Sequence, residues 1–147
     1  MTALIRYFAI GFFSFFLSAC GGGSETGSGE NANIQLPSTL VGQSISYKVT
    51  NSGTAGIPVG YEILWTFSSG GVIKGKNPVT GQVVTPNTYS YQVSGDKGAV
   101  DVRYVQGTQT AYEIYTMTAQ TQSSGTYTYE GNTGTGVKTA AGTYTVQ

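Results

Sequence analysis

The sequence predicts an all-β protein whose folded part is one antiparallel domain. Beyond residue 34, aromatic and β-branched residues alternate with polar ones, and no segment sustains the apolar period of an amphipathic helix. Turn signals rich in Gly and Ser separate the alternating segments, as at 51–56, 94–98 and 131–136. Such short connections favour antiparallel neighbours, because parallel strands require a crossover of about a dozen residues or more.

Eight segments show the alternation clearly enough to be predicted as strands. In chain order they are Ser44–Thr50, Tyr61–Ser68, Gly71–Lys76, Thr88–Val93, Ala99–Val105, Ala111–Thr121, Gly125–Glu130 and Gly142–Gln147.

The alternation also assigns side chains to two faces of the predicted sheet. The face expected to be buried takes Ile45, Tyr47, Val49, Tyr61, Ile63, Trp65, Phe67, Tyr89, Tyr91, Val93, Val100, Val102, Tyr104, Tyr112, Ile114, Tyr127, Tyr129, Tyr144 and Val146. The outer face takes Lys48, Glu62, Gln92, Asp101, Arg103, Glu113, Tyr115 and most threonines. Covering one face requires the sheet to close or fold over, so we expect an up-and-down barrel, with a β-sandwich as the alternative.

The first twenty residues have a different composition from the rest of the chain. Arg6 is their only charge, and an almost wholly apolar run follows from Tyr7 to Leu17. This pattern is typical of a secretory signal peptide, and the run is shorter than the roughly 18 residues expected of a membrane-spanning helix.

The only cysteine of the chain follows this run directly, in Leu17-Ser18-Ala19-Cys20. The motif resembles the lipobox of bacterial lipoproteins. The resemblance implies cleavage before Cys20, a diacylglyceryl group on its thiol and an acyl chain such as palmitate on its amine. Gly21 follows the cysteine, and in that family a residue other than Asp there implies sorting to the outer membrane.

A Gly- and Ser-rich stretch links the expected anchor to the folded domain. Residues 21–33 read GGGSETGSGENAN, a composition typical of a flexible coil. The chain is therefore divided into a signal peptide (1–19), a lipidated cysteine with its tether (20–33) and a β domain (34–147). Two or three acyl chains, at ~0.8 kcal/mol per buried methylene, would hold the domain firmly on a membrane.

Composition excludes several classes of function. Seven Lys and Arg balance seven Asp and Glu, so nothing indicates a nucleic-acid partner. The chain has no histidine, which excludes a His-based catalytic triad and an imidazole metal site. Its carboxylates lack the spacing of a calcium loop, and its glycine clusters lack a phosphate-binding lysine. We therefore expect neither a metal nor a cofactor.

Paired carboxylates are the one catalytic arrangement that the composition allows. Glu62 and Glu113 occupy matching Tyr-Glu-Ile triplets, with Asp101 in support, and two carboxylates are enough for glycoside hydrolysis. All three are predicted on the outer face, where they would pair with Lys48 or Arg103. We therefore expect surface ion pairs and a non-enzymatic domain, with a carbohydrate-active hydrolase as the alternative.

Tyrosines dominate the face that is predicted to be buried. At the level of pattern, residues 40–147 resemble the small calycin-like barrels, which include lipocalins and MoaF-type proteins, and that resemblance implies a central cavity. One interpretation is that the rings fill the core while their hydroxyls reach water or carbonyls. The other is that six aromatic residues line a partly wet ligand cavity. These six are Tyr47, Trp65, Tyr89, Tyr91, Tyr104 and Tyr112.

The expected function is therefore binding, by a lipoprotein of the outer membrane, of an envelope protein partner or a small ligand. A further alternative is self-assembly through the segments GTYTYE (125–130) and GTYTVQ (142–147), if either forms an exposed edge. We expect them instead to pair with each other as a hairpin.

The lipid anchor predicts a specific effect of removing the thiol. Cys20→Ala should move the protein from the membrane fraction to the soluble fraction, because no acyl chain is then attached. Ser24→Ala in the tether is the control and should leave the protein in the membrane. Mass spectrometry of the wild-type protein should find an acylated N-terminal Cys20; an unmodified N-terminus at another residue would contradict the prediction.

Overall fold

The computed structural model describes residues 34–84, 88–106, 109–132 and 134–147. The segments predicted to be a signal peptide and a tether, together with Cys20, lie within 1–33 and so outside the described residues. None of the described residues forms a helix long and apolar enough to cross a membrane.

The described chain folds into nine strands and one short 3-10 turn. The turn, η1, is Ser69–Gly71. The strands are β1 Ser44–Asn51, β2 Glu62–Phe67, β3 Ile73–Lys76, β4 Val83–Val84, β5 Thr88–Ser94, β6 Lys97–Gln106, β7 Gln109–Ala119, β8 Ser124–Asn132 and β9 Val137–Val146.

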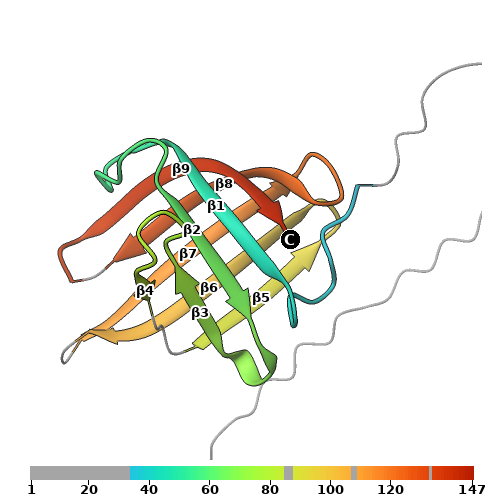
Figure 1. Ribbon diagram of the computed structural model, residues 1–147, viewed down its shortest axis with the longest axis horizontal. Helices are drawn as coiled ribbons and strands as arrows, with labels where there is room; N and C mark the ends of the chain where they lie inside the picture. Colours follow the sequence, from blue (N-terminus) through green and yellow to red (C-terminus); the bar gives the residue numbers. More distant parts are fainter. Residues whose placement is uncertain (1–33, 85–87, 107–108, 133) are drawn as a thin grey trace, which may run out of the picture. The chain divides into compact units, whose positions relative to one another are not determined.

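The nine strands form one antiparallel sheet in the order β4-β3-β2-β1-β9-β8-β7-β6-β5. The sheet curls into a half-barrel (Figure 1). Every strand lies beside its neighbours in sequence except at β4 and β5, and β1 pairs with β9. The prediction of a single, barrel-like, antiparallel all-β domain is confirmed.

Two segments close the ends of the curled sheet. At one end, Leu36 and Leu40 are buried, and the Leu36 N–H donates to the Gly95 carbonyl at 3.0 Å. At the opposite end, the loop 52–61 between β1 and β2 folds over β9. The Ala55 N–H donates to the Thr139 carbonyl at 2.9 Å, which holds this loop in place.

Side chains join the edge strand β5 to the end of β2 and to η1. The rings of Phe67 and Tyr89 meet edge to face, with centroids 4.9 Å apart. The Tyr89 hydroxyl donates to the Ser68 carbonyl at 3.4 Å, next to η1. The curled sheet therefore surrounds one core, whose largest fully buried side chains are Trp65, Tyr47, Tyr144 and Phe67. Burying side chains of this size stabilises the fold by about 1.5–3 kcal/mol each.

Most of the predicted inner face is confirmed, but the assignment of β7 was wrong. Tyr112 and Ile114 were expected inside, yet they pair with Arg103 and Asp101 on the outer face. Glu113 and Tyr115 point inward instead. The reason is the composition of the whole strand, since Ala111, Tyr115, Met117 and Ala119 are all buried on the face that Glu113 shares. Four apolar side chains therefore outweigh one carboxylate.

The last two strands form the expected hairpin. β8 pairs with β9 from Ser124↔Thr145 to Asn132↔Val137, and both strands are internal to the sheet. GTYTYE and GTYTVQ are therefore not edges, which removes the basis for self-assembly through them.

Because Tyr115 faces inward and Tyr112 faces outward on β7, replacing each by Ala should change the free energy of unfolding by different amounts. Tyr115→Ala should lower the free energy of unfolding by about 3–5 kcal/mol, because it empties a buried ring site. Tyr112→Ala removes only outer-face contacts with Arg103 and Glu130 and should cost about 1 kcal/mol or less. Urea denaturation followed by circular dichroism measures both values. A larger loss of stability for Tyr112→Ala would contradict the assignment of Tyr115 to the inner face.

Candidate functional site

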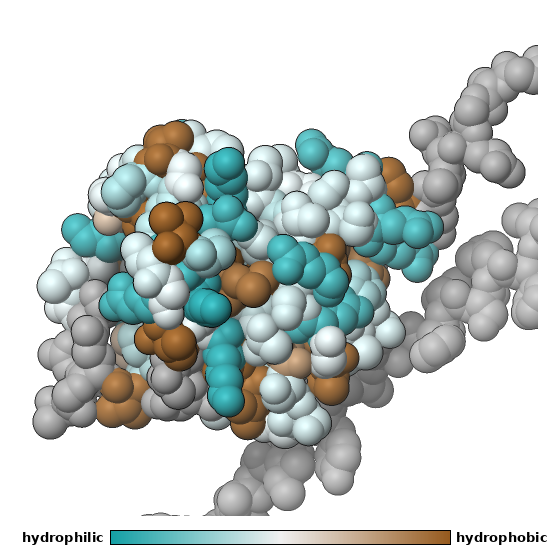
Figure 2. Space-filling model, viewed as in Figure 1, coloured by the Kyte–Doolittle hydropathy of each residue, from teal (hydrophilic) through white to brown (hydrophobic). Residues whose placement is uncertain are grey.

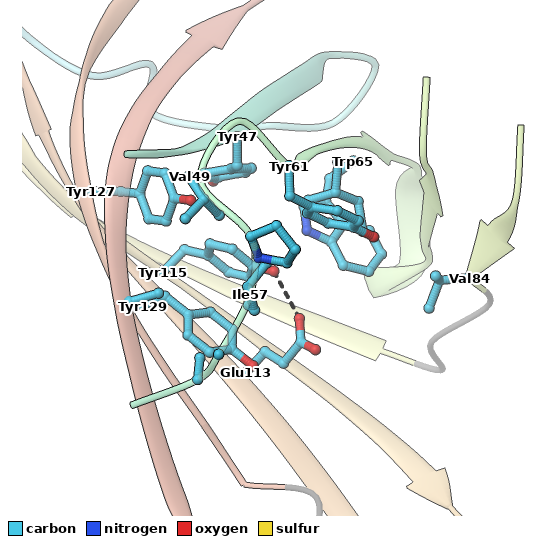
Figure 3. A pocket seen from close by; sticks show the side chains of 15 residues that line it. Tyr47, Val49, Ile57, Tyr61, Trp65, Val84, Glu113, Tyr115, Tyr127 and Tyr129 are labelled. Carbon is cyan, nitrogen blue, oxygen red and sulfur yellow. Dashed lines mark hydrogen bonds between the residues drawn. The ribbon is translucent and has the colours of Figure 1, made fainter. Parts of the chain in front are cut away.

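A partly open cavity of about 330 Å³ lies between loop 52–61 and the inner face of the sheet (Figure 3). Aromatic and aliphatic side chains make up most of its wall, and Glu113 is its one charged residue. The lining residues are Tyr47, Val49, Ala55, Gly56, Ile57, Pro58, Tyr61, Ile63, Trp65, Val84, Glu113, Tyr115, Tyr127, Tyr129 and Ala140.

β7 positions the carboxylate of Glu113 at this cavity. Glu113 is half-buried and pairs across the sheet with Val102 and Gly131. The Tyr115 hydroxyl donates to Glu113 Oε2 at 2.7 Å, and the Tyr104 hydroxyl donates to Oε1 at 3.2 Å. Figure 3 shows the carboxylate turned toward the Tyr115 hydroxyl among the lining side chains. Two tyrosines therefore fix the orientation of the carboxylate.

The ionisation of Glu113 is opposed by its surroundings. Burial raises the pKa of Glu113 above its ordinary value, and the hydrogen bonds from Tyr115 and Tyr104 only partly offset this. Burial and the nearby Glu113 charge also raise the pKa values of Tyr115, Tyr104 and Tyr129. These phenols remain protonated, and those of Tyr115 and Tyr104 donate to Glu113.

Trp65 supplies a second polar group at the cavity. Its ring lies across Gly75 on β3, where a Cβ would come within 2.4 Å of the indole carbon Cζ3. The side chain is fully buried, and its N–H has no hydrogen-bond partner within the described chain. The N–H lies near enough to the Tyr115 hydroxyl to lower its pKa slightly, without completing a hydrogen bond. An unpaired buried donor costs about 1–3 kcal/mol, so this N–H is available to an acceptor.

No cation of the described chain neutralises Glu113. Within the described residues the one ion pair joins Arg103 to Asp101 at 2.6 Å, on the outer face. Lys138 lies in the same cross-strand row as Glu113, since both residues pair with Gly131. It borders a separate hollow with Ala55, Ile57 and Tyr129 and forms no ion pair.

The six aromatic residues predicted to line a cavity are divided by the structure. Tyr47 and Trp65 line it, and Tyr104 contacts Glu113 beside it. Tyr89 on the edge strand β5 packs on Phe67 of β2, and Tyr91 donates to the Pro37 carbonyl at 2.9 Å. Tyr112 was wrongly placed, because it lies on the outer face, 5.0 Å below the Arg103 guanidinium.

Several lining residues were missed by the sequence analysis. Tyr61, Tyr127 and Tyr129 were assigned to the inner face but not to the cavity, and Tyr115 and Glu113 were assigned to the wrong face. Counting apolar side chains over all eleven residues of β7 would have corrected the last two. Nothing in the sequence indicated that loop 52–61 folds over the cavity.

The three catalytic candidates are not brought together. Glu62 lies on the outer face and accepts a hydrogen bond from the Ser46 hydroxyl; it stands opposite Lys48 in the strand register but forms no ion pair with it. Asp101 is bound to Arg103, also outside. Glu113 alone reaches the cavity, so the paired carboxylates occupy opposite faces of the sheet. Among the described residues no three acidic, His or Cys side chains cluster as metal ligands.

Comparison of the chain with protein-family models, with curated proteins and with solved structures finds no match. The site must therefore be interpreted from its own chemistry.

The raised pKa of Glu113 predicts a pH-dependent effect of neutralising it. The folded state binds this proton more tightly than the unfolded state, so the stabilisation present at acidic pH is lost as pH rises through the folded-state pKa. Glu113→Gln removes that loss and should gain stability relative to wild type between acidic and neutral pH.

Urea denaturation at several pH values from about 4 to 8, a range that begins near the ordinary pKa of Glu, measures this difference. The matched control is Glu130→Gln, since Glu130 accepts from the Tyr112 hydroxyl at 3.0 Å on the exposed outer face. A stability difference for Glu113→Gln that does not change with pH would refute the assignment.

Proposed function

We propose that the protein is a lipid-anchored binding module of the bacterial cell envelope that holds a small ligand in the cavity beneath loop 52–61. The observation that carries the proposal is the cavity itself. It is concave and mostly apolar, with a few converging polar groups, and these are the general features of small-ligand sites.

Anchoring through Cys20 agrees with the position of the cavity in the fold. The described chain starts at Ile34 and is tied to the Gly95 turn through Leu36, at the end of the sheet opposite loop 52–61. The first described residues therefore lie at the end of the domain away from the cavity. We propose the outer membrane as the location, on the strength of Gly21 after the lipobox cysteine.

A hydrolase acting through paired carboxylates is a weaker proposal. Both retaining and inverting glycosidases need two carboxyl groups on either side of one sugar bond, within about 10 Å of each other and facing the same site. Glu62 and Asp101 face away from Glu113, and each already has a polar partner.

A protein partner is the second candidate, favoured by exposed valines at the cavity end. Val59, Val83, Val105 and Val137 are 65%, 62%, 63% and 53% exposed. Figure 2 shows the apolar residues of one face as small groups separated by hydrophilic ones. Affinity capture of the membrane-bound protein, carried out in parallel with wild type and with the Val105→Glu variant, tests this candidate. A protein that is captured with wild type and not with the variant would support it.

Two neighbouring alanines on β9 provide a matched test of the cavity. Ala140 lines it, whereas Ala141 faces the outside. Ala140→Phe should fill the cavity and reduce a co-purifying small molecule by about tenfold or more, while Ala141→Phe leaves it unchanged.

Protein extracted from membranes without denaturation is analysed for bound molecules by native mass spectrometry, and circular dichroism checks that both variants fold. Equal amounts of the molecule in both variants would place it outside the cavity and contradict the proposal.

A further inference from the structure

We infer that the ligand of this cavity is a compact organic cation, an alkylated ammonium group carried near a hydrogen-bond acceptor, with Glu113 as its counter-ion. The inference rests on the proposed function, because it names the class of ligand for the same cavity. Three features of the wall lead to it: an unneutralised carboxylate, a set of electron-rich rings and an unpaired N–H.

The first step concerns the charge of Glu113. A carboxylate that is taken out of water is stable when it is paired, and hydrogen bonds from two neutral phenols supply orientation without a countercharge. The basic residues of the β domain are Lys48, Lys74, Lys76, Lys97, Arg103 and Lys138. None of them forms an ion pair with Glu113. A cation bound from outside the domain would therefore supply the countercharge that these residues do not.

The second step concerns the rings. Tyr47, Tyr115 and Tyr127 come from three different strands and pack with centroids 4.5–5.8 Å apart, at tilted and edge-to-face angles. Tyr61 and Trp65 form another part of the wall (Figure 3). Electron-rich rings that line the same cavity as a carboxylate attract cations, and alkylated ammonium groups favour such rings because they lose little hydration. Metal ions would instead need several oxygen ligands, and this wall offers one carboxylate.

The third step concerns Trp65. Its indole N–H is buried at the cavity wall without a partner, so it can donate to an oxygen of the bound molecule. A cation that carries a hydroxyl, ether or ester oxygen close to its nitrogen satisfies Glu113 and Trp65 together. A neutral apolar molecule of the same shape neither balances the charge of Glu113 nor accepts a hydrogen bond from Trp65.

The test compares choline with 3,3-dimethylbutan-1-ol, a neutral molecule of the same shape in which carbon replaces the nitrogen. Full-length mature protein in a non-ionic detergent is titrated with each probe, and Trp65, the only tryptophan, reports binding by fluorescence. Wild type should bind choline about tenfold or more tightly than the alcohol.

Variants separate charge from shape. Glu113→Gln should weaken choline binding about tenfold or more and leave the alcohol within about twofold, whereas Glu130→Gln should change neither. Tyr61→Leu, which keeps apolar bulk but removes a ring, should weaken choline more than the alcohol. Ala140→Phe should abolish binding of both probes.

The outcomes distinguish this inference from the proposed function. Equal affinity for the two probes, or choline binding that ignores Glu113→Gln, overturns the cation inference while the cavity still holds a ligand. Failure of both probes to bind, with a molecule still co-purifying in an Ala140-dependent manner, also overturns the inference alone. Loss of the co-purifying molecule as well overturns both.

Discussion

The pairing of β1 with β9 is the constraint on which the rest of the fold depends. It joins the two ends of the domain, with Ile45↔Val146 and Tyr47↔Tyr144 on the inner face. Without it, β1 to β4 and β5 to β9 would be two separate antiparallel sheets, each with one uncovered apolar face. The pairing makes them one curled sheet that buries a shared core, and it places Tyr47 beside the rings of Tyr115 and Tyr127.

Glycines on the inner face decide how large aromatic rings fit inside so narrow a barrel. A Cβ on Gly75 would collide with Trp65, and one on Gly142 would approach the Tyr127 ring within 2.7 Å. Each ring therefore covers a glycine of a neighbouring strand, where no side chain is in the way. The ring also shields the backbone of that glycine from solvent. The cavity persists beside these rings because the space above them is covered by a loop and is not filled by other side chains.

The sequence was informative where one period dominated a segment. The eight alternating segments each contain a strand, since alternation in β1, β2, β5 and β6 gives one apolar face and one polar face. β4 was missed because two valines are too few to establish a period. The first half of β9, before Gly142, was missed because the small residues Ala140 and Ala141 show no contrast between the two faces.

The candidate site was harder to predict from the sequence for a related reason. In β7 a polar residue occupies the buried face, so the local triplet around Glu113 favoured the wrong phase. The contacts that make the site come from long sequence separations, such as Tyr47 against Met117 and Ala55 against Thr139. No local pattern encodes such contacts, and they follow only once the order of the strands is known.

The unpaired boundary between β4 and β5 gives the barrel wall a built-in line of weakness. No strand ladder joins these two among the described residues; β5 instead contacts the end of β2 and η1 through the Phe67–Tyr89 ring pair and one long hydrogen bond. Separating them breaks few backbone hydrogen bonds, whereas opening any other part of the wall breaks a whole ladder. Among the described strands we therefore expect amide hydrogen exchange to be faster in β4 and β5 than in β1, β9 and β8.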